Sequence, residues 1–354
     1  MRAHPVSRRK LLEAGVTLAA GVAAAPLRAA PPEPAAITPA LVAAARKEGR
    51  LAWYTAMDLP VAEQLAKAFQ AGFPGIEVQV ERTGSERLFT RINQEYASNI
   101  RVADAVNSAD AAHFIVWKRN GWLVPYLPEE VARHFPADYR DPEGFHVTTR
   151  IWLCSLGYNT DMVKPEQAPR SFADLLDPRW TGRMVKAHPA YSGTIMSATF
   201  QIVRDLGWDY LEKLSRQRIM QVQSSTDPPK KLALGERAVM ADGNDYNLIQ
   251  LKERGQPVEV VYPAEGTPII KGPSAVLAAA PNPNAARLFH NWLHGTGGQQ
   301  IVVDFARQLS AHPLVTDKRG RKPLAEIRLM RDDPEGVERM SEEIKRRYAE
   351  LFKV

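Results

Sequence analysis

Three consecutive stretches decide the fold: RLAWYT (residues 50–55), PVAEQLAKAFQAG (residues 60–72) and IEVQVER (residues 76–82). The first is apolar, as expected for a buried strand, and the third alternates between apolar and polar residues, as a strand with one exposed face does. Between them, Val61, Leu65 and Phe69 recur at helical spacing. This strand–helix–strand order predicts a parallel sheet with helices packed on both faces.

The same alternation extends along most of the chain. Strands are predicted at residues 151–158, 184–187, 219–222, 239–241, 258–263 and 274–279, and helices at residues 40–48, 85–99, 193–206, 228–234, 284–294 and 333–351. The strands at 151–158 and 258–263 lie at opposite ends of the middle segment, so we expect them to connect two α/β lobes and to act as a hinge. Because ligands of open α/β sheets bind outside the carboxyl ends of the strands, two facing lobes predict one cleft.

The N-terminus has the three parts of an export signal. SRRKLL (residues 7–12) carries an arginine pair, a mostly apolar run covers residues 15–25, and small residues precede PPEP (residues 31–34). We interpret residues 1–30 as a twin-arginine signal peptide with cleavage at Ala29 or Ala30. The apolar run is shorter than the roughly 20 residues that a membrane-spanning helix needs. The protein is therefore expected to work in the periplasm.

Charge and cysteine content exclude several functions. Without residues 1–30, which hold five basic side chains and one acidic one, the net charge falls from +6 to +2. A nearly neutral surface gives no support for nucleic-acid binding, which uses a concentrated basic face. The one cysteine, Cys154, excludes an intramolecular disulfide and a cysteine-based metal cluster.

In their order and spacing, several stretches resemble the ferric-type branch of the extracellular solute-binding proteins of ABC importers. They are LAWYTA (51–56), RTGSE (82–86), SADA (108–111), PRSFADLL (169–176), WTGR (180–183), PAYSGT (189–194), GERAV (235–239) and APNPNAA (280–286). The resemblance implies an α/β, two-lobed periplasmic binding protein of type II-like architecture, with a mixed, mostly parallel sheet flanked by helices in each lobe. We assign residues 31–150 and 264–322 to the first lobe, residues 151–263 to the second, and residues 323–354 to a C-terminal helical extension.

This resemblance implies a monomer, without a cofactor, that captures a small solute and delivers it to an ABC permease. Two alternatives belong to other classes: a sensory protein that presents its ligand to a receptor, and a secreted hydrolase or transferase. The sequence has no Gly-x-Ser-x-Gly elbow, no His-Glu-x-x-His motif and no phosphate loop with Gly-Lys-Ser/Thr. Because these motifs carry the common hydrolytic and phosphoryl-transfer chemistries, an enzyme is the weaker hypothesis.

Two hydroxyl–glycine loops form the candidate anion site. They are Thr83, Gly84 and Ser85 before one predicted helix, and Ser192, Gly193 and Thr194 before another, in different lobes. Free N–H groups and the helix dipole make a helix N-terminus a site for anions. Ordinary N-capping by Ser or Thr produces the same pattern without a ligand. The positions of the two loops favour a phosphate, phosphonate or carboxylate held from both lobes.

Further candidate ligand-binding residues lie at or after other strands: Tyr54, Ser108, Asp110, Asp242, Asn244 and Tyr246. Tyr54 ends the first strand and points into the cleft, unless it is a core tyrosine. The acidic groups after residue 241 could receive an ammonium group of a zwitterionic solute, unless this stretch is a solvated loop.

The pattern of the iron-binding members is incomplete here. Those proteins carry two adjacent tyrosines in the second lobe, with a histidine and a glutamate from the first, whereas Tyr246 stands alone and no histidine follows Tyr54. If the solute is a metal ion, oxygen atoms of Tyr246, Asp245 and Asp110 are the remaining candidate ligands. We therefore expect a small anionic solute, with ferric iron as the alternative ligand.

Overall fold

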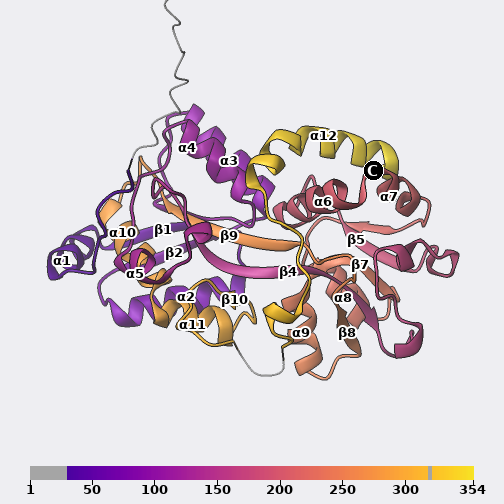
Figure 1. The fold of residues 1–354 in the computed structure, drawn as a ribbon. Helices are drawn as coiled ribbons and strands as arrows, with labels where there is room; N and C mark the ends of the chain where they lie inside the picture. Colours follow the sequence, from indigo (N-terminus) through magenta and orange to yellow (C-terminus); the bar gives the residue numbers. More distant parts are fainter. Residues whose placement is uncertain (1–29, 318–320) are drawn as a thin grey trace, which may run out of the picture. The chain divides into compact units, whose positions relative to one another are not determined.

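The computed structural model of the protein describes residues 30–317 and 321–354. The predicted twin-arginine sequence and the expected cleavage position Ala29 lie outside the described residues. The other expected cleavage position, Ala30, is the first described residue. No helix in the described part is long and apolar enough to cross a membrane. Two groups of strands, each flanked by helices, are joined through one long strand, β4 (Figure 1).

The first lobe contains the strand–helix–strand unit predicted from the sequence. β1 (Arg50–Thr55) pairs in parallel with β2 (Glu77–Arg82) and with β3 (Ala105–Asn107). β9 (Ile269–Val276) and β10 (Leu309–Ser310) complete this sheet beside the first half of β4 (Val147–Asn159). Its helices are α1 (Pro39–Glu48), α2 (Leu59–Gly72), α3 (Ser85–Ala97), α4 (Ala111–Arg119), α5 (Glu129–His134), α10 (Pro283–His294) and α11 (Thr296–Asp304).

Both faces of this sheet are buried, as the apolar stretch at 50–55 predicts. Trp53 packs in one cluster with Phe69 of α2 and Phe289 of α10. Tyr54, the next residue of β1, packs on the opposite face with Trp117 of α4. Successive side chains of a strand point to opposite faces, so a strand covered on both sides is apolar throughout.

The long strand β4 belongs to both lobes. Residues 147–153 pair with β9, and residues 154–159 pair with β7 and β8 of the second lobe. At this change of partner, Asp245 accepts a hydrogen bond from the N–H of Leu153 at 3.1 Å. β8 (Val258–Val261) pairs within the second lobe, so the chain returns to the first lobe over residues 262–268, slightly later than predicted.

The second lobe repeats the alternation of strands and helices. β7 (Val239–Asn244), β5 (Met184–Ala187) and β6 (Met220–Val222) lie side by side and parallel, next to the second half of β4. Its helices are α6 (Gly193–Leu206), α7 (Trp208–Ser215), α8 (Asp227–Ala233) and α9 (Asp245–Glu253). The one-turn helices of the chain are η1 (Ala137–Tyr139), η2 (Pro165–Gln167), η3 (Ala173–Leu176), η4 (Pro178–Trp180) and η5 (Leu324–Glu326).

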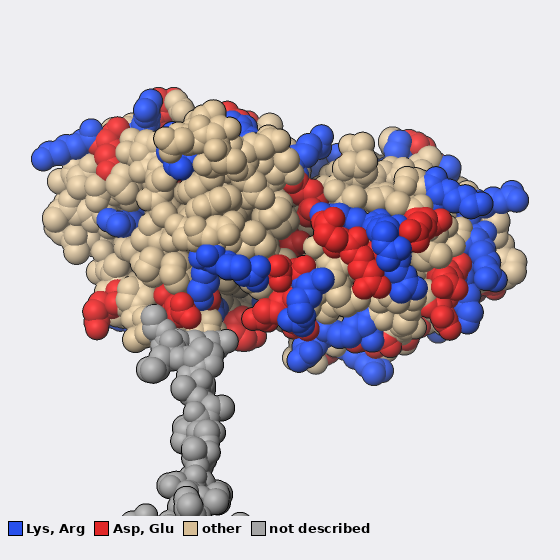
Figure 2. All heavy atoms as spheres, turned by 90° about the horizontal axis from the view of Figure 1, so that it is seen from above, with Lys and Arg blue, Asp and Glu red and all other residues tan. Residues whose placement is uncertain are grey.

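The last helix, α12 (Pro334–Phe352), contacts both lobes. Val337 and Ile344 pack in one cluster with Ala112 of α4 and with Phe200 of α6. The exposed side of the helix is strongly charged: seen from above, Lys and Arg alternate with Asp and Glu over this part, whereas the adjoining face of the first lobe carries few charges (Figure 2). The residue limits assigned to the lobes stay a prediction, since α12 packs on both.

Candidate functional site

The N-termini of α3 and α6, one from each lobe, meet beside β4. Gly84 is the N-cap of α3, and Ser192 is the N-cap of α6. A Cβ atom on Gly193 would lie only 2.7 Å from the Cβ of Asp110 and 3.0 Å from the Cβ of Ser85. Such distances are too short for carbon atoms, so the two lobes can approach this closely only because residue 193 is glycine.

A small cavity of about 50 Å³ lies at this meeting point. Its first-lobe lining includes Ala56, Asp58, Arg82, Gly84, Ser85, Arg87 and Ala109; β4 contributes Arg150 and Trp152; the second lobe contributes Tyr191, Ser192, Thr194, Gln223, Ser224, Ser225, Thr226 and Tyr246. One buried water needs at least about 10–15 Å³ of such space, so the cavity holds roughly three to five water-sized groups. That is the size of a phosphoryl or carboxylate group.

Arg150 is the most unusual residue of the cavity. Its side chain is 2% exposed, and within the described residues its Nε and Nη2 atoms have no hydrogen-bond acceptor. The guanidinium stacks on the ring of Trp152 at 4.7 Å, and the Nε1 atom of Trp152 also lacks an acceptor there. Burial lowers the pKa of Arg150, yet a guanidinium stays protonated in proteins. The cavity therefore holds a buried positive charge with several free donors, which is costly without an anion.

Arg82 and Asp58 form a charged wall at one end of the cavity. Arg82 donates from Nε to the carbonyl of Met57 at 3.1 Å. Asp58 accepts a hydrogen bond at 3.2 Å from the Nδ2 of Asn247, which lies in α9 of the second lobe. This bond ties the two lobes together at the edge of the cavity.

The second lobe supplies hydroxyl groups from the segment before α8. The hydroxyls of Ser224 and Thr226 lie 2.9 Å apart. Asn244 donates from Nδ2 to Ser225 at 3.3 Å and to the hydroxyl of Tyr246 at 3.1 Å. Burial, followed by the nearby Asp58 carboxylate, raises the pKa of Tyr246 well above its usual value, so its phenol is neutral.

The structure brings together five of the predicted site residues on the cavity wall: Gly84, Ser85, Ser192, Thr194 and Tyr246. Gly193 lies directly behind them in contact with Asp110, and Asn244 supports Tyr246. Thr83 precedes the wall and donates its N–H to the carbonyl of Thr55.

Tyr54 and Ser108 are placed elsewhere. Tyr54 is fully buried under α3, and its hydroxyl donates to Glu95 at 2.8 Å, which corrects the expectation that it points into the cleft. Ser108 pairs with the Nδ1 of His113 at 3.2 Å. Both residues stabilise the first lobe and do not line the cavity.

Asp242 and Asp245 also lie outside the cavity wall, and each is paired with a cation. Asp242 forms a buried ion pair with Lys186, and Asp245 forms one with Arg321. Asp110 accepts from the N–H of Ala112 at 2.9 Å as the N-cap of α4. Two of the three oxygen ligands proposed for a metal, Asp245 and Asp110, are therefore committed to structural roles, and only Tyr246 lies on the cavity wall.

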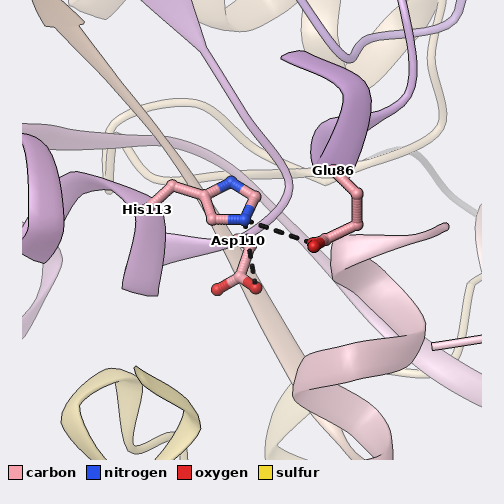
Figure 3. A group of neighbouring side chains, drawn as sticks. All are labelled: Glu86, Asp110 and His113. Atoms are coloured by element: carbon pink, nitrogen blue, oxygen red, sulfur yellow. Dashed lines mark ion pairs between the residues drawn. The ribbon is translucent and has the colours of Figure 1, made fainter. Parts of the chain in front are cut away.

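A different group of ligand atoms lies close together behind the cavity: Glu86, Asp110 and His113 (Figure 3). The Nε2 atom of His113 is 3.2 Å from Glu86 and 3.8 Å from Asp110. Burial raises the pKa of Asp110 to about 6. Although burial disfavours charge on His113, the carboxylates of Asp110 and Glu86 raise its pKa above the usual value. Lys345 of α12 lies 3.4 Å from Glu86, so cations of the protein already balance this group.

Several residues of the cavity were not predicted as site residues from the sequence. They stand within or beside predicted strands and helices, and they are Arg82, Arg87, Arg150 and Trp152. Ser224, Ser225 and Thr226 could have been found by the rule that located the other two loops, because these hydroxyl residues also stand between a strand and a helix. The position of Arg150 could not, because an arginine at the start of an apolar strand is usually at the surface.

Comparison with known proteins agrees with this architecture. The model of a family described as bacterial extracellular solute-binding protein matches residues 108–323. An uncharacterized protein from Haemophilus influenzae is 26% identical over 274 residues, which cover 74% of this chain and 78% of that protein. A probable ABC transporter periplasmic-binding protein, y4fP, from Sinorhizobium fredii is 24% identical over 267 residues, 72% of each chain.

Solved structures show the same fold. The periplasmic binding protein AfuA from Actinobacillus pleuropneumoniae, with fructose-6-phosphate bound, superposes with a TM-score of 0.80 at 23% identity, covering 86% of this chain and 99% of that one. Iron-bound HitA from Pseudomonas aeruginosa gives a TM-score of 0.74 at 22% identity, covering 84% of this chain and 99% of that one. At these identities the likeness concerns the fold alone.

Proposed function

Because the chain belongs to the bacterial extracellular solute-binding protein family, we propose that it captures a small organic anion in the cavity between its lobes and delivers it to an ABC permease. The observation that carries the proposal is the buried guanidinium of Arg150, whose Nε and Nη2 have no acceptor in the described part of the chain. Leaving such a group unpaired costs far more than pairing it, so a bound anion supplies its missing acceptors.

Three further features support an anionic head group. The N-termini of α3 and α6 border the cavity from opposite lobes, and each carries the positive end of a helix dipole. The Nε1 atom of Trp152 adds a neutral donor. A phosphoryl, phosphonate or carboxylate group fits these donors, and the related fold of AfuA holds a sugar phosphate.

Ferric iron is the second candidate ligand because of the relationship to HitA. A hard ferric ion needs deprotonated phenolate or carboxylate oxygens. Burial raises the pKa of Tyr246, so ferric binding would have to displace its phenolic proton, and Asp245 is already paired with Arg321. The donors on the cavity wall are mainly N–H and O–H groups, which favours an anion over a cation.

The test is binding of phosphate monoesters and carboxylates by calorimetry. Arg150→Gln is expected to lower the affinity for the bound anion by roughly a hundredfold or more, because hydrogen bonds to charged groups contribute about 1.5–3 kcal/mol each. Arg133→Gln is the matched control, since Arg133 is 61% exposed and pairs with Glu129 on α5. Wild-type affinity in the Arg150 variant would contradict the proposal.

Tyr246→Phe in the same assay separates anion binding from metal binding. Loss of a phenolate ligand would abolish ferric binding, whereas an organic anion loses at most one hydrogen bond. Retained anion binding in this variant supports the proposal, and loss of all binding together with ferric binding by the wild type would replace it with a metal site.

A further inference from the structure

A second, much larger groove of about 960 Å³ lies on the side of the cleft formed by α2, α9 and α11. Its volume is near the upper end of the range of about 300–1,000 Å³ that is usual for small-molecule sites. A group of the size of phosphate or acetate matches the 50 Å³ cavity and is far smaller than this groove.

The groove and the cavity adjoin each other. Asp58, Arg82 and Thr226 line both of them. We call these three residues, which carry a carboxylate, a guanidinium and a hydroxyl group, the neck between the two spaces. A molecule that occupies both spaces has to pass them.

Part of the groove wall is apolar and exposed. Leu59, at the start of α2, is 45% exposed, and Phe305, directly after α11, is 46% exposed. Leu251 of α9 lines the groove from the second lobe. Exposed apolar side chains gathered on one concave surface are typical of a binding site, whereas isolated ones are common on any surface.

Hydrogen bonds between the lobes cross the same groove. Gln250 of α9 donates from Nε2 to the carbonyls of Phe305 and Ala306, each at 3.2 Å. The bond from Asn247 to Asp58 joins the lobes at the neck, so a solute that occupies both spaces has to bypass or displace it. A molecule in the groove thus lies against residues of both lobes.

We propose that the solute is an elongated organic anion: a phosphoryl or carboxylate head, one or two hydrogen-bonding groups at the neck, and an apolar body that packs between Leu59, Leu251 and Phe305. This inference rests on the proposed function, because the anionic head in the cavity sets the position of the body. A solute with a fully hydroxylated body leaves the exposed apolar side chains without a partner.

The experiment compares ligands that share a head group but differ in the body. Calorimetry measures the affinities of the purified protein for methyl phosphate, phenyl phosphate and glucose 6-phosphate, and for acetate and phenylacetate. The comparison uses the phosphates or the carboxylates, whichever head group the protein binds. The compound with the phenyl ring is expected to bind at least about tenfold more tightly than the one with the methyl group, since the ring buries apolar area. Glucose 6-phosphate is expected to bind more weakly than phenyl phosphate.

Two variants locate the gain in the groove. Leu59→Ser combined with Phe305→Ser is expected to remove most of the advantage of the phenyl compound and to leave the affinity for the methyl compound unchanged. Leu234→Ser is the control, because Leu234 is 71% exposed and lies outside the groove. Serine at either groove position replaces an exposed side chain, so the variants are expected to fold.

The outcomes separate the inference from the function on which it rests. Equal affinities for phenyl and methyl compounds, or tighter binding of glucose 6-phosphate than of phenyl phosphate, would overturn the apolar body while the anion site stands. An unchanged phenyl advantage in the double variant would overturn the assignment to Leu59 and Phe305. Failure of every anion to bind would overturn the proposed function together with the inference.

Discussion

Two buried cations, Lys186 and Arg150, have opposite surroundings. Each is 2% exposed. Lys186, on β5 inside the second lobe, is paired with Asp242 of β7. Arg150, on β4 where the lobes meet, has no acceptor for Nε and Nη2 within the described residues. A buried charge that is hydrogen-bonded to its counter-ion belongs to the structure of the protein, whereas one whose donors have no acceptor indicates a site for a ligand.

The largest effect is expected from breaking the paired cation. Asp242→Asn leaves the Lys186 ammonium buried without its counter-ion and should lower the free energy of unfolding by about 3–5 kcal/mol. Urea denaturation followed by circular dichroism measures this change. In the double variant Lys186→Met, Asp242→Leu most of the loss should be recovered, because no charge remains buried. If Asp242→Asn alone is as stable as the wild type, the Lys186–Asp242 ion pair does not contribute to stability.

Replacing the unpaired cation should have a smaller effect of the opposite sign. Arg150→Met keeps the aliphatic packing, removes a buried charge without acceptors, and should raise the free energy of unfolding of the ligand-free protein by about 1 kcal/mol. Denaturation of this variant beside Arg133→Met, which should change stability little, measures the difference. A clear loss of stability would mean that Arg150 serves the structure, and the contrast with Lys186 would disappear.

The smallest effect concerns His113, whose pairing depends on pH. Burial lowers the pKa of His113, but Asp110 and Glu86 raise it further, so the pKa is higher in the folded protein than in the unfolded chain. The protonated imidazole therefore stabilises the fold fully at pH below the unfolded pKa of about 6.5. This stabilisation is lost as pH rises through the pKa of the folded protein. The free energy of unfolding should therefore fall as pH rises above 7.

Other buried groups also titrate near this range. The pKa values of His146, His188, His290 and His294 are lowered by burial, so their contributions are lost as pH falls through about 6.5 and oppose the slope of His113 near pH 7. Burial raises the pKa of the Cys154 thiol, which adds to the slope at higher pH. The difference between the pH profiles of the wild type and of His113→Gln therefore isolates His113, and identical profiles would refute the assignment.

Much of the fold could be predicted because local patterns and packing agree. The stretch at 50–55 became β1, and the helix predicted at 193–206 became α6 with the same limits. The three-residue strand β3 was missed, whereas the equally short β6 was predicted at 219–222. β4 extends four residues before the predicted start at Ile151, because its polar first residues are covered by the first lobe.

Only those residues of the candidate site whose position is set by secondary structure could be predicted. The loops at Ser85 and Ser192 stand at helix N-termini, and helix periodicity locates those positions. Which charged side chains form ion pairs could not be predicted from one sequence. Asp242 pairs with Lys186, which is 56 residues away, and Arg150 lacks such a partner among the described residues. Whether a charged residue is free for a ligand depends on residues distant in the chain.

Helix α12 sets a mechanical constraint on the cleft. The chain passes between the lobes along β4 and again over residues 262–268, and α12 rests on α4 and α6 together (Figure 1). Separating the lobes on the side of α12 requires this helix to leave α4 or α6, whereas on the side of α2, α9 and α11 the lobes are joined by side-chain bonds such as that from Asn247 to Asp58. We therefore expect the cleft to widen first on the side of α2, α9 and α11.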